Sequence, residues 1–149
     1  MITTEAIIDA ANMELLKIFP SCTFYTDFTE KDFARPAFLI LCDKRGAAKK
    51  LTRRVSEFVL YMTVWHYAKT NEYYRADGTG LRDVLDKMTD IFAKEFMHVG
   101  ERAVRVKVAD GGVREKEAYL DLEIRYTEES GVPDADEKEI MRKLYQKMN

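Results

Sequence analysis

The stretch Val55–Tyr67, VSEFVLYMTVWHY, limits the possible folds of this chain more than any other segment. It contains no Gly, Pro or Asn and is rich in β-branched and aromatic residues, which fit the pleated, half-buried surface of a sheet. It therefore predicts one long central strand. Its faces carry Phe58, Leu60, Met62 and Val64 on one side, and Val59, Tyr61, Thr63 and Trp65 on the other.

Both faces of this predicted strand are largely apolar, so both need cover. We expect helices on the face with Leu60 and a neighbouring subunit or the last helix of the chain on the face with Tyr61. The alternative is that one chain covers both faces by itself.

Composition sets broad limits on the class of protein. The chain has 149 residues, of which 46% are hydrophobic and 34% charged, as expected for one globular domain. A net charge of -2 gives no general attraction to nucleic acid or to acidic membranes. No apolar run approaches the ~18 residues of a membrane span. A secretory signal is not indicated, and Ile2 stands where N-myristoylation requires Gly.

Apolar residues at spacings of three and four predict three helices. The first, Thr4–Phe19, is capped by Thr3 or Thr4 and stopped by Pro20. Its stripe consists of Ile7, Ile8, Ala11, Leu15 and Ile18. The second, Leu81–Val99, is capped by Asp77 or Thr79 and is followed by Gly100. The third, Glu137–Met148, has a narrow apolar stripe and must dock on its own domain or on a neighbour.

Further strands are predicted on both sides of the main helix. Thr23–Phe28 and Ala37–Asp43 precede the long strand, and Arg102–Val108 and Ala118–Tyr126 alternate apolar and polar residues. Asp110-Gly111-Gly112 predicts the hairpin turn between the last two. The order α-β-β-β-α-β-β-α predicts an α+β two-layer sandwich: a mainly antiparallel sheet of about five strands, with helices packed on one face.

Positive charge is concentrated in Lys44–Arg54, KRGAAKKLTRR. Gly46 and two alanines predict a flexible hairpin loop. One interpretation is a solvated loop tip, and the other is a basic patch that meets an acidic partner or nucleic-acid phosphates. No aromatic residue interrupts the segment, so stacking on bases is not indicated. Its cations are Lys44, Arg45, Lys49, Lys50, Arg53 and Arg54.

The sequence holds no catalytic motif. His66 and His98 form no Ser-His-Asp or Cys-His set, and each fits a structural or surface role. Cys22 and Cys42 fit two small buried hydrophobes of a reducing cytosol, with a disulfide or metal site as the alternative. Residues 77–80, DGTG, lack the Lys-Ser/Thr of a phosphate loop, so a capping turn is favoured. We expect neither enzyme activity nor a cofactor nor a metal.

Several short motifs follow one another between residues 1 and 127. Phe19-Pro20 ends the first helix and Phe24-Tyr25-Thr26 follows, and the sequence FARPAF at 33–38 enters the second strand. The later ones are the basic loop, Phe58-x-x-Tyr61, the helix with Leu81 and Leu85, and Leu120-x-Leu122-x-Ile124-x-Tyr126. In this order of motifs the chain resembles the tail-terminator-like (tail completion) proteins of phages and prophages of Gram-positive bacteria.

The resemblance implies a structural protein of the virion tail, assembled in the bacterial host cytoplasm, with no reaction and no cofactor. It implies a ring, a hexamer, that caps the head-proximal end of the tail tube and offers a docking surface to head-completion proteins. DNA would pass through such a ring. It divides the chain into a tail-terminator-like domain, 1–127, and a linker with a C-terminal helix, 128–149.

In that setting the expected contact residues are the six cations of Lys44–Arg54 together with Tyr61 and Trp65. The basic loop would line the lumen of the ring or touch the acidic rim of the tube or a neighbouring subunit. Two other functions stay open. One is a head–tail connector that binds the portal side, and the other is a small ligand-binding or regulatory module that uses the space beneath the long strand.

Overall fold

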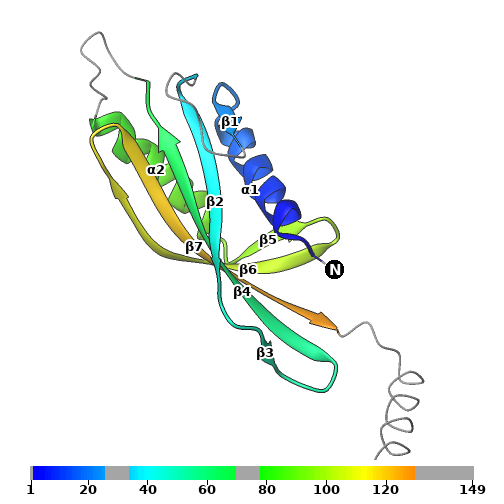
Figure 1. Cartoon of the computed structure of the whole chain (residues 1–149). Helices are drawn as coiled ribbons and strands as arrows, with labels where there is room; N and C mark the ends of the chain where they lie inside the picture. The colour runs from blue at the N-terminus through cyan, green and yellow to red at the C-terminus, as the bar shows by residue number, and fades with distance from the viewer. Residues whose placement is uncertain (1, 26–33, 70–77, 130–149) are drawn as a thin grey trace, which may run out of the picture.

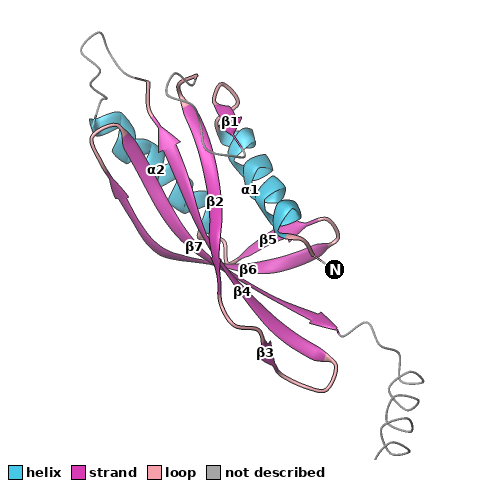
Figure 2. Ribbon diagram, in the orientation of Figure 1, coloured by secondary structure: helices cyan, strands magenta, loops and turns pink. Residues whose placement is uncertain are grey.

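The computed structural model of the chain describes residues 2–25, 34–69 and 78–129. Two helices and seven strands follow in the order α1 (Thr4–Ile18), β1 (Thr23–Tyr25), β2 (Ala37–Arg45), β3 (Lys49–Lys50), β4 (Val55–Tyr67), α2 (Gly78–Phe92), β5 (Phe96–Val99), β6 (Arg102–Val113) and β7 (Glu117–Glu129) (Figures 1 and 2). The α+β class is confirmed. The strand count of about five was too low, because two short strands, β3 and β5, lie in segments expected to be loop and helix.

All strands belong to one curled sheet. Its order is β1-β2-β4-β7-β6-β5, with β3 paired to β4. The pairing is antiparallel except between β1 and β2, which run parallel.

The long strand is confirmed as the centre of the sheet. β4 has the predicted bounds and pairs with β7 over its whole length, from Val55 opposite Glu129 to Tyr67 opposite Glu117. On its other side it pairs with β2 and, near its start, with β3. Figure 1 shows that β3, the start of β4 and the end of β7 form an arm that projects away from both helices.

Both helices contribute to one hydrophobic core on the predicted face of β4. Leu60, Met62 and Val64 of β4 share this core with residues of α1 and α2. From the helices it contains Ile7, Ala11, Leu15, Met88 and Phe92. The Thr3 hydroxyl caps α1 as predicted, since it accepts a hydrogen bond from the Ala6 N–H at 3.1 Å. Ile18 was wrongly placed in the core stripe, because its side chain is 52% exposed.

The main helix ends earlier than predicted. α2 stops at Phe92, and the four residues Phe96–Val99 form β5, paired with the start of β6. Glu95 between them has a φ of 74°, a left-handed conformation that a right-handed helix does not contain. His98, which we expected near the helix end, is therefore an exposed strand residue. Over only four residues, the apolar spacing suits a helix or a strand equally well.

The predicted turn at Asp110-Gly111-Gly112 is also wrong, because these residues lie inside β6. A Cβ on Gly112 would lie 2.9 Å from the ring of Tyr119, its cross-strand partner. The glycine thus leaves room for the aromatic ring that lies across it, and it does not mark a reversal of the chain. The reversal comes after β6, where the Arg114 N–H donates to the Glu117 carbonyl at 2.7 Å.

Some expectations concern segments outside the described residues. These are the C-terminal helix Glu137–Met148, the end of the strand expected over Thr23–Phe28, and a cap by Asp77. Thr79, the other expected cap, lies inside α2.

Candidate interaction surface

The face of β4 that α1 and α2 leave open carries aromatic rings and cations. We call the outward side chains of β2, β4 and β7 on this side the open face. The Trp65 and Tyr119 rings lie 5.5 Å apart, and the Arg114 guanidinium lies 5.4 Å from the first ring and 5.2 Å from the second. Further along β4, the Lys44 ammonium lies 5.3 Å from the Tyr61 ring. These are cation–π distances, so the cations are positioned over the sheet.

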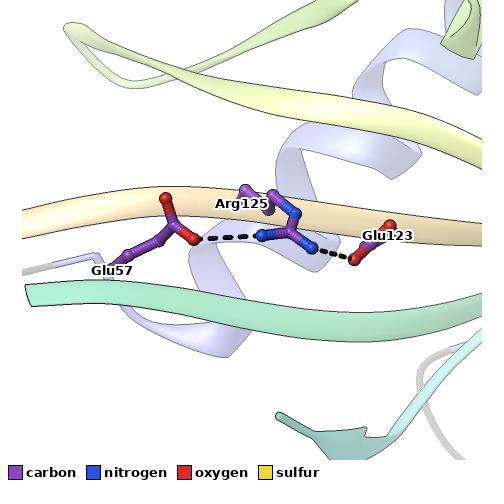
Figure 3. Close-up of polar contacts among 3 residues, drawn as sticks. All are labelled: Glu57, Glu123 and Arg125. Atoms are coloured by element: carbon purple, nitrogen blue, oxygen red, sulfur yellow. Dashed lines mark hydrogen bonds and ion pairs between the residues drawn. The ribbon is translucent and has the colours of Figure 1, made fainter. Parts of the chain in front are cut away.

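Between and beside the rings the open face is polar. Asp121 of β7 accepts a hydrogen bond from the Thr63 hydroxyl at 2.7 Å. Nearer the arm, the Arg125 guanidinium bridges Glu57 of β4 at 3.0 Å and Glu123 of its own strand at 2.6 Å (Figure 3). The hydrogen bond and charge of Glu123, with the weaker contribution of Glu57, raise the pKa of Arg125. The open face therefore combines an ionic cluster of one cation and two carboxylates near the arm with cation–aromatic pairs, of whose rings Tyr61 is exposed and Trp65 and Tyr119 are half-buried.

The basic segment is divided into three parts instead of forming one loop. Lys44 and Arg45 end β2, and Lys49 and Lys50 form β3, opposite Glu57 and Ser56 of β4. The loop prediction fails here because β4 extends far enough to supply a pairing partner. Residues 51–54 make the reversal, with the Leu51 and Thr52 N–H groups donating to the Val55 carbonyl. We call Lys49–Arg54 the basic turn, and its four cations are exposed.

The predicted contact residues fall into two groups. Lys44, Tyr61 and Trp65 share the open face, whereas the cations of the basic turn lie at the arm. Arg45 belongs to neither group, because its guanidinium donates to the Thr4 hydroxyl at the start of α1 at 2.8 Å.

Sequence reasoning missed Tyr119 and Arg114, the partners of Trp65. The alternation of β7 did place Tyr119 on the polar side of its strand. The sequence did not reveal the strand register that brings Tyr119 opposite Trp65. It also did not reveal that the chain turns only after β6, which brings Arg114 over both rings.

One groove opens on the far part of the sheet, where the α2–β5 connection meets β6 and β7. Its volume is about 580 Å³, and it is lined by Ala93, Glu95, Arg105, Val106, Lys107, Val108, Glu123 and Arg125. The space beneath the long strand is different: Leu60, Met62 and Val64 are at most 1% exposed, because helix side chains fill it. A ligand module that uses that space is therefore not supported.

Other candidate centres are few in the part of the chain that the structure describes. There, no three His, Cys, Asp or Glu side chains gather as metal ligands. Neither described helix is long and apolar enough to cross a membrane. The side chains of Cys22 and Cys42 are half-buried, not fully buried as expected, and burial raises the pKa of Cys22. His66 is 4% exposed, and its Nδ1 has no hydrogen-bond partner.

The chain is thus a small α+β domain whose two described helices contribute to one core, and whose open face carries aromatic rings and cations. A protein-family model described as Phage tail terminator protein matches residues 6–130, and the chain belongs to this family. The resemblance to tail-terminator proteins that the sequence showed is thereby confirmed. The family is one of structural phage-tail proteins and not of enzymes, so the chain is a component of the virion tail. No curated protein matches the sequence.

Proposed function

We propose that this chain forms a ring, a hexamer, that caps the head-proximal end of the tail tube and joins it to head-completion proteins. The observation that carries the proposal is the open face, because Tyr, Trp and Arg are the residues enriched where protein interfaces are most buried. A closed ring sets one patch of each subunit against a different patch of the next. In it, the open face contacts the neighbouring subunit.

The basic turn has a separate role in this proposal. It stands at the end of an arm, away from the helices (Figure 1), and carries four cations without an acid. From there it lines the lumen through which DNA passes, or it contacts the acidic rim of the tube or the next subunit. Assembly takes place in the cytoplasm of the bacterial host, before the tail joins the head.

The ring itself is tested by native mass spectrometry and electron microscopy of the full chain, alone and mixed with its tail tube protein. The proposal predicts a six-fold ring that binds one end of the tube. Rings that bind only portal-side proteins would show the connector function instead. A monomer in both samples would refute the proposal.

The open face is tested by Tyr61→Ser, with Phe96→Ser as the matched control. Both rings are exposed, 38% for Tyr61 and 51% for Phe96, and each lies under one cation, Lys44 or Arg105. Tyr61 lies on β4 at the centre of the open face, whereas Phe96 lies on β5 at the edge of the sheet. Y61S should raise the concentration needed for ring formation about thirtyfold, as for an interface aromatic worth about 2 kcal/mol. Equal effects of Y61S and F96S would contradict the role of this face.

The basic turn is tested by reversing Lys49, Lys50, Arg53 and Arg54 to Glu. All four are exposed, so the circular dichroism spectrum of the monomer should be unchanged, while assembled tails are lost. The pair K94E/K107E reverses exposed cations elsewhere, and K49E/K50E is its matched counterpart. Phage yield should fall for K49E/K50E and stay normal for K94E/K107E. A normal yield from the fourfold variant would sink this part of the proposal.

A further inference from the structure

The side of α1 that points away from the sheet carries two large apolar residues. Met13 is 63% exposed and Leu16 is 47% exposed, and we call them the apolar pair. The residues that α1 buries are Ile7, Ala11 and Leu15. At about 100° per residue, the apolar pair lies on the other side of the helix from these three. It is therefore outside the core of the domain.

Two acids extend the apolar pair toward the start of the helix. Asp9 precedes Met13 by four residues, and Glu5 precedes Asp9 by four, so all of them lie along one side of α1. Both acids are exposed. We call Glu5, Asp9, Met13 and Leu16 the outer stripe. Single exposed apolar residues are ordinary, but the outer stripe is ordered, with its acids at one end and its apolar pair at the other.

The open face carries the complementary order along β4. The Lys44 ammonium lies over the Tyr61 ring, and the Trp65 ring packs against its neighbour on β7. The four strand positions from Tyr61 to Trp65 span ~13 Å, and the seven helical positions from Asp9 to Leu16 span ~10 Å. An acid of the stripe therefore reaches the cation while the apolar pair lies on the aromatic rings.

We propose that the outer stripe of one copy of this chain docks on the open face of the next copy. Asp9 then lies at Lys44, and this pair of opposite charges sets the register of the contact. The apolar pair lies on the rings of Trp65 and Tyr119, because thioether and aliphatic groups pack well on aromatic rings. The inference rests on the proposed function, since it names the surface of the neighbour that the open face contacts.

The two surfaces lie on opposite sides of the sheet. α1 shares its core with Leu60 and Met62 of β4, whereas Tyr61 and Trp65 alternate with these residues and point the other way. Each copy therefore uses its open face toward one neighbour and its outer stripe toward the other. Such a head-to-tail contact gives a ring where the rotation closes and an open chain where it does not.

Two substitutions on α1 form a matched pair that tests the apolar part of the contact. Leu16 and Ile18 are similarly exposed, 47% and 52%, but they lie about 200° apart around the helix. Leu16→Ser should raise the protein concentration needed for assembly of the full chain about tenfold, as for an apolar residue in an interface. Ile18→Ser should leave it unchanged. Sedimentation velocity over a concentration series measures both, alone and with the tail tube protein.

Charge reversal tests the register of the contact. Asp9→Lys and Lys44→Glu should each raise the same concentration about fivefold, because each sets like charges against one another. An equal mixture of the two variants should assemble like the unaltered chain, because D9K then offers Lys44 to the Asp9 of K44E and the two introduced charges meet at the next contact. An even-numbered ring such as a hexamer closes with the variants in alternation. Asp86→Lys, which reverses an exposed acid of α2, is the control and should change nothing.

The outcomes separate this contact from the ring itself. Equal effects of L16S and I18S, or a mixture of D9K and K44E that assembles no better than its components, would overturn the inference and leave a ring of the unaltered chain standing. Open chains that L16S weakens and the mixture restores would support the contact and refute the ring. An unaltered chain that stays monomeric, alone and with the tube protein, would refute both.

Discussion

The burial of His66 predicts how the stability of the domain depends on pH, because its imidazole lies uncharged inside an aromatic cluster. Its ring lies 4.6 Å from the Phe38 ring and 6.4 Å from the Phe19 ring, centroid to centroid. The side chain is 4% exposed, and among the described residues its Nδ1 has no hydrogen-bond partner. Burial therefore lowers the pKa of His66 from 6.5 to about 4.

The sign of the effect follows from proton linkage. Below pH 6.5 the unfolded chain binds a proton at this imidazole, while the folded chain stays neutral until about pH 4. Stability is thus lost as the pH falls through this window. A shift of 2.5 pKa units, from 6.5 to about 4, corresponds to about 3 kcal/mol in total, of which about 2 kcal/mol is lost between pH 7 and pH 5. This is a large part of the ~5–15 kcal/mol of a typical domain.

The measurement is urea unfolding of the chain and of His66→Leu at pH 7, 6 and 5. The leucine is similar in volume and has no polar nitrogen to bury, so H66L should be at least as stable at pH 7. At pH 5 it should exceed the unaltered chain by about 2 kcal/mol more than at pH 7. H98Q removes an exposed imidazole and controls for the loss of a histidine as such. A constant difference between H66L and the unaltered chain across this range would refute the reasoning.

The pH range used for His66 lies above the range in which the carboxylate of Glu128 changes the stability. Glu128 is partly buried, which by itself raises its pKa, but the Ile2 N–H and Arg102 lower it below the ordinary 4.5 in balance. Its contribution is complete above the unfolded value and is lost as the pH falls below it. The measurements at pH 5 and above therefore report on His66.

Two other substitutions test single features of the fold. Gly112→Ala should destabilise the domain by about 1–3 kcal/mol, because the added Cβ would lie 2.9 Å from the Tyr119 ring. In a chain that also carries Tyr119→Ala, much of this cost should vanish. If the cost persists there, the overlap with the ring is not its cause. Thr3→Ala should cost about 1 kcal/mol by loss of the cap on Ala6, whereas Thr3→Ser should cost little. Equal urea midpoints for T3A and T3S would contradict the capping role.

The parts of the fold that the sequence predicted are long segments of uniform composition or spacing. β4 has thirteen residues without Gly, Pro or Asn and is rich in β-branched and aromatic side chains, and its bounds were predicted correctly. Ile7, Ala11 and Leu15, spaced four residues apart, mark the buried side of α1. Such segments contain enough residues to decide between a strand and a helix.

The errors lie where a local pattern has two explanations and a distant contact chooses between them. Asp110-Gly111-Gly112 fits a turn, but the Tyr119 ring across the sheet requires a glycine in a strand. The basic segment fits a loop, but Lys49 and Lys50 pair with the start of β4 and so form a strand. The sequence named Lys44, Tyr61 and Trp65 as contact residues, which stays a prediction, and it did not name the residues that pack against Trp65. Tyr119 and Arg114 join Trp65 only through strand register, which no single segment specifies.

The two faces of β4 differ in burial, and the separate roles proposed for them can be tested at neighbouring positions. Met62 faces the helices and is 1% exposed, whereas Tyr61 faces outward and is 38% exposed. Met62→Ala should therefore cost about 2–5 kcal/mol of stability, while ring formation by the molecules that remain folded is unchanged. Y61S should show the opposite, with a near-normal urea midpoint and weakened assembly. If M62A weakens assembly in proportion to its loss of stability and Y61S does not weaken it at all, the outer face of β4 is only a solvated surface, and the contacts between subunits must be sought elsewhere.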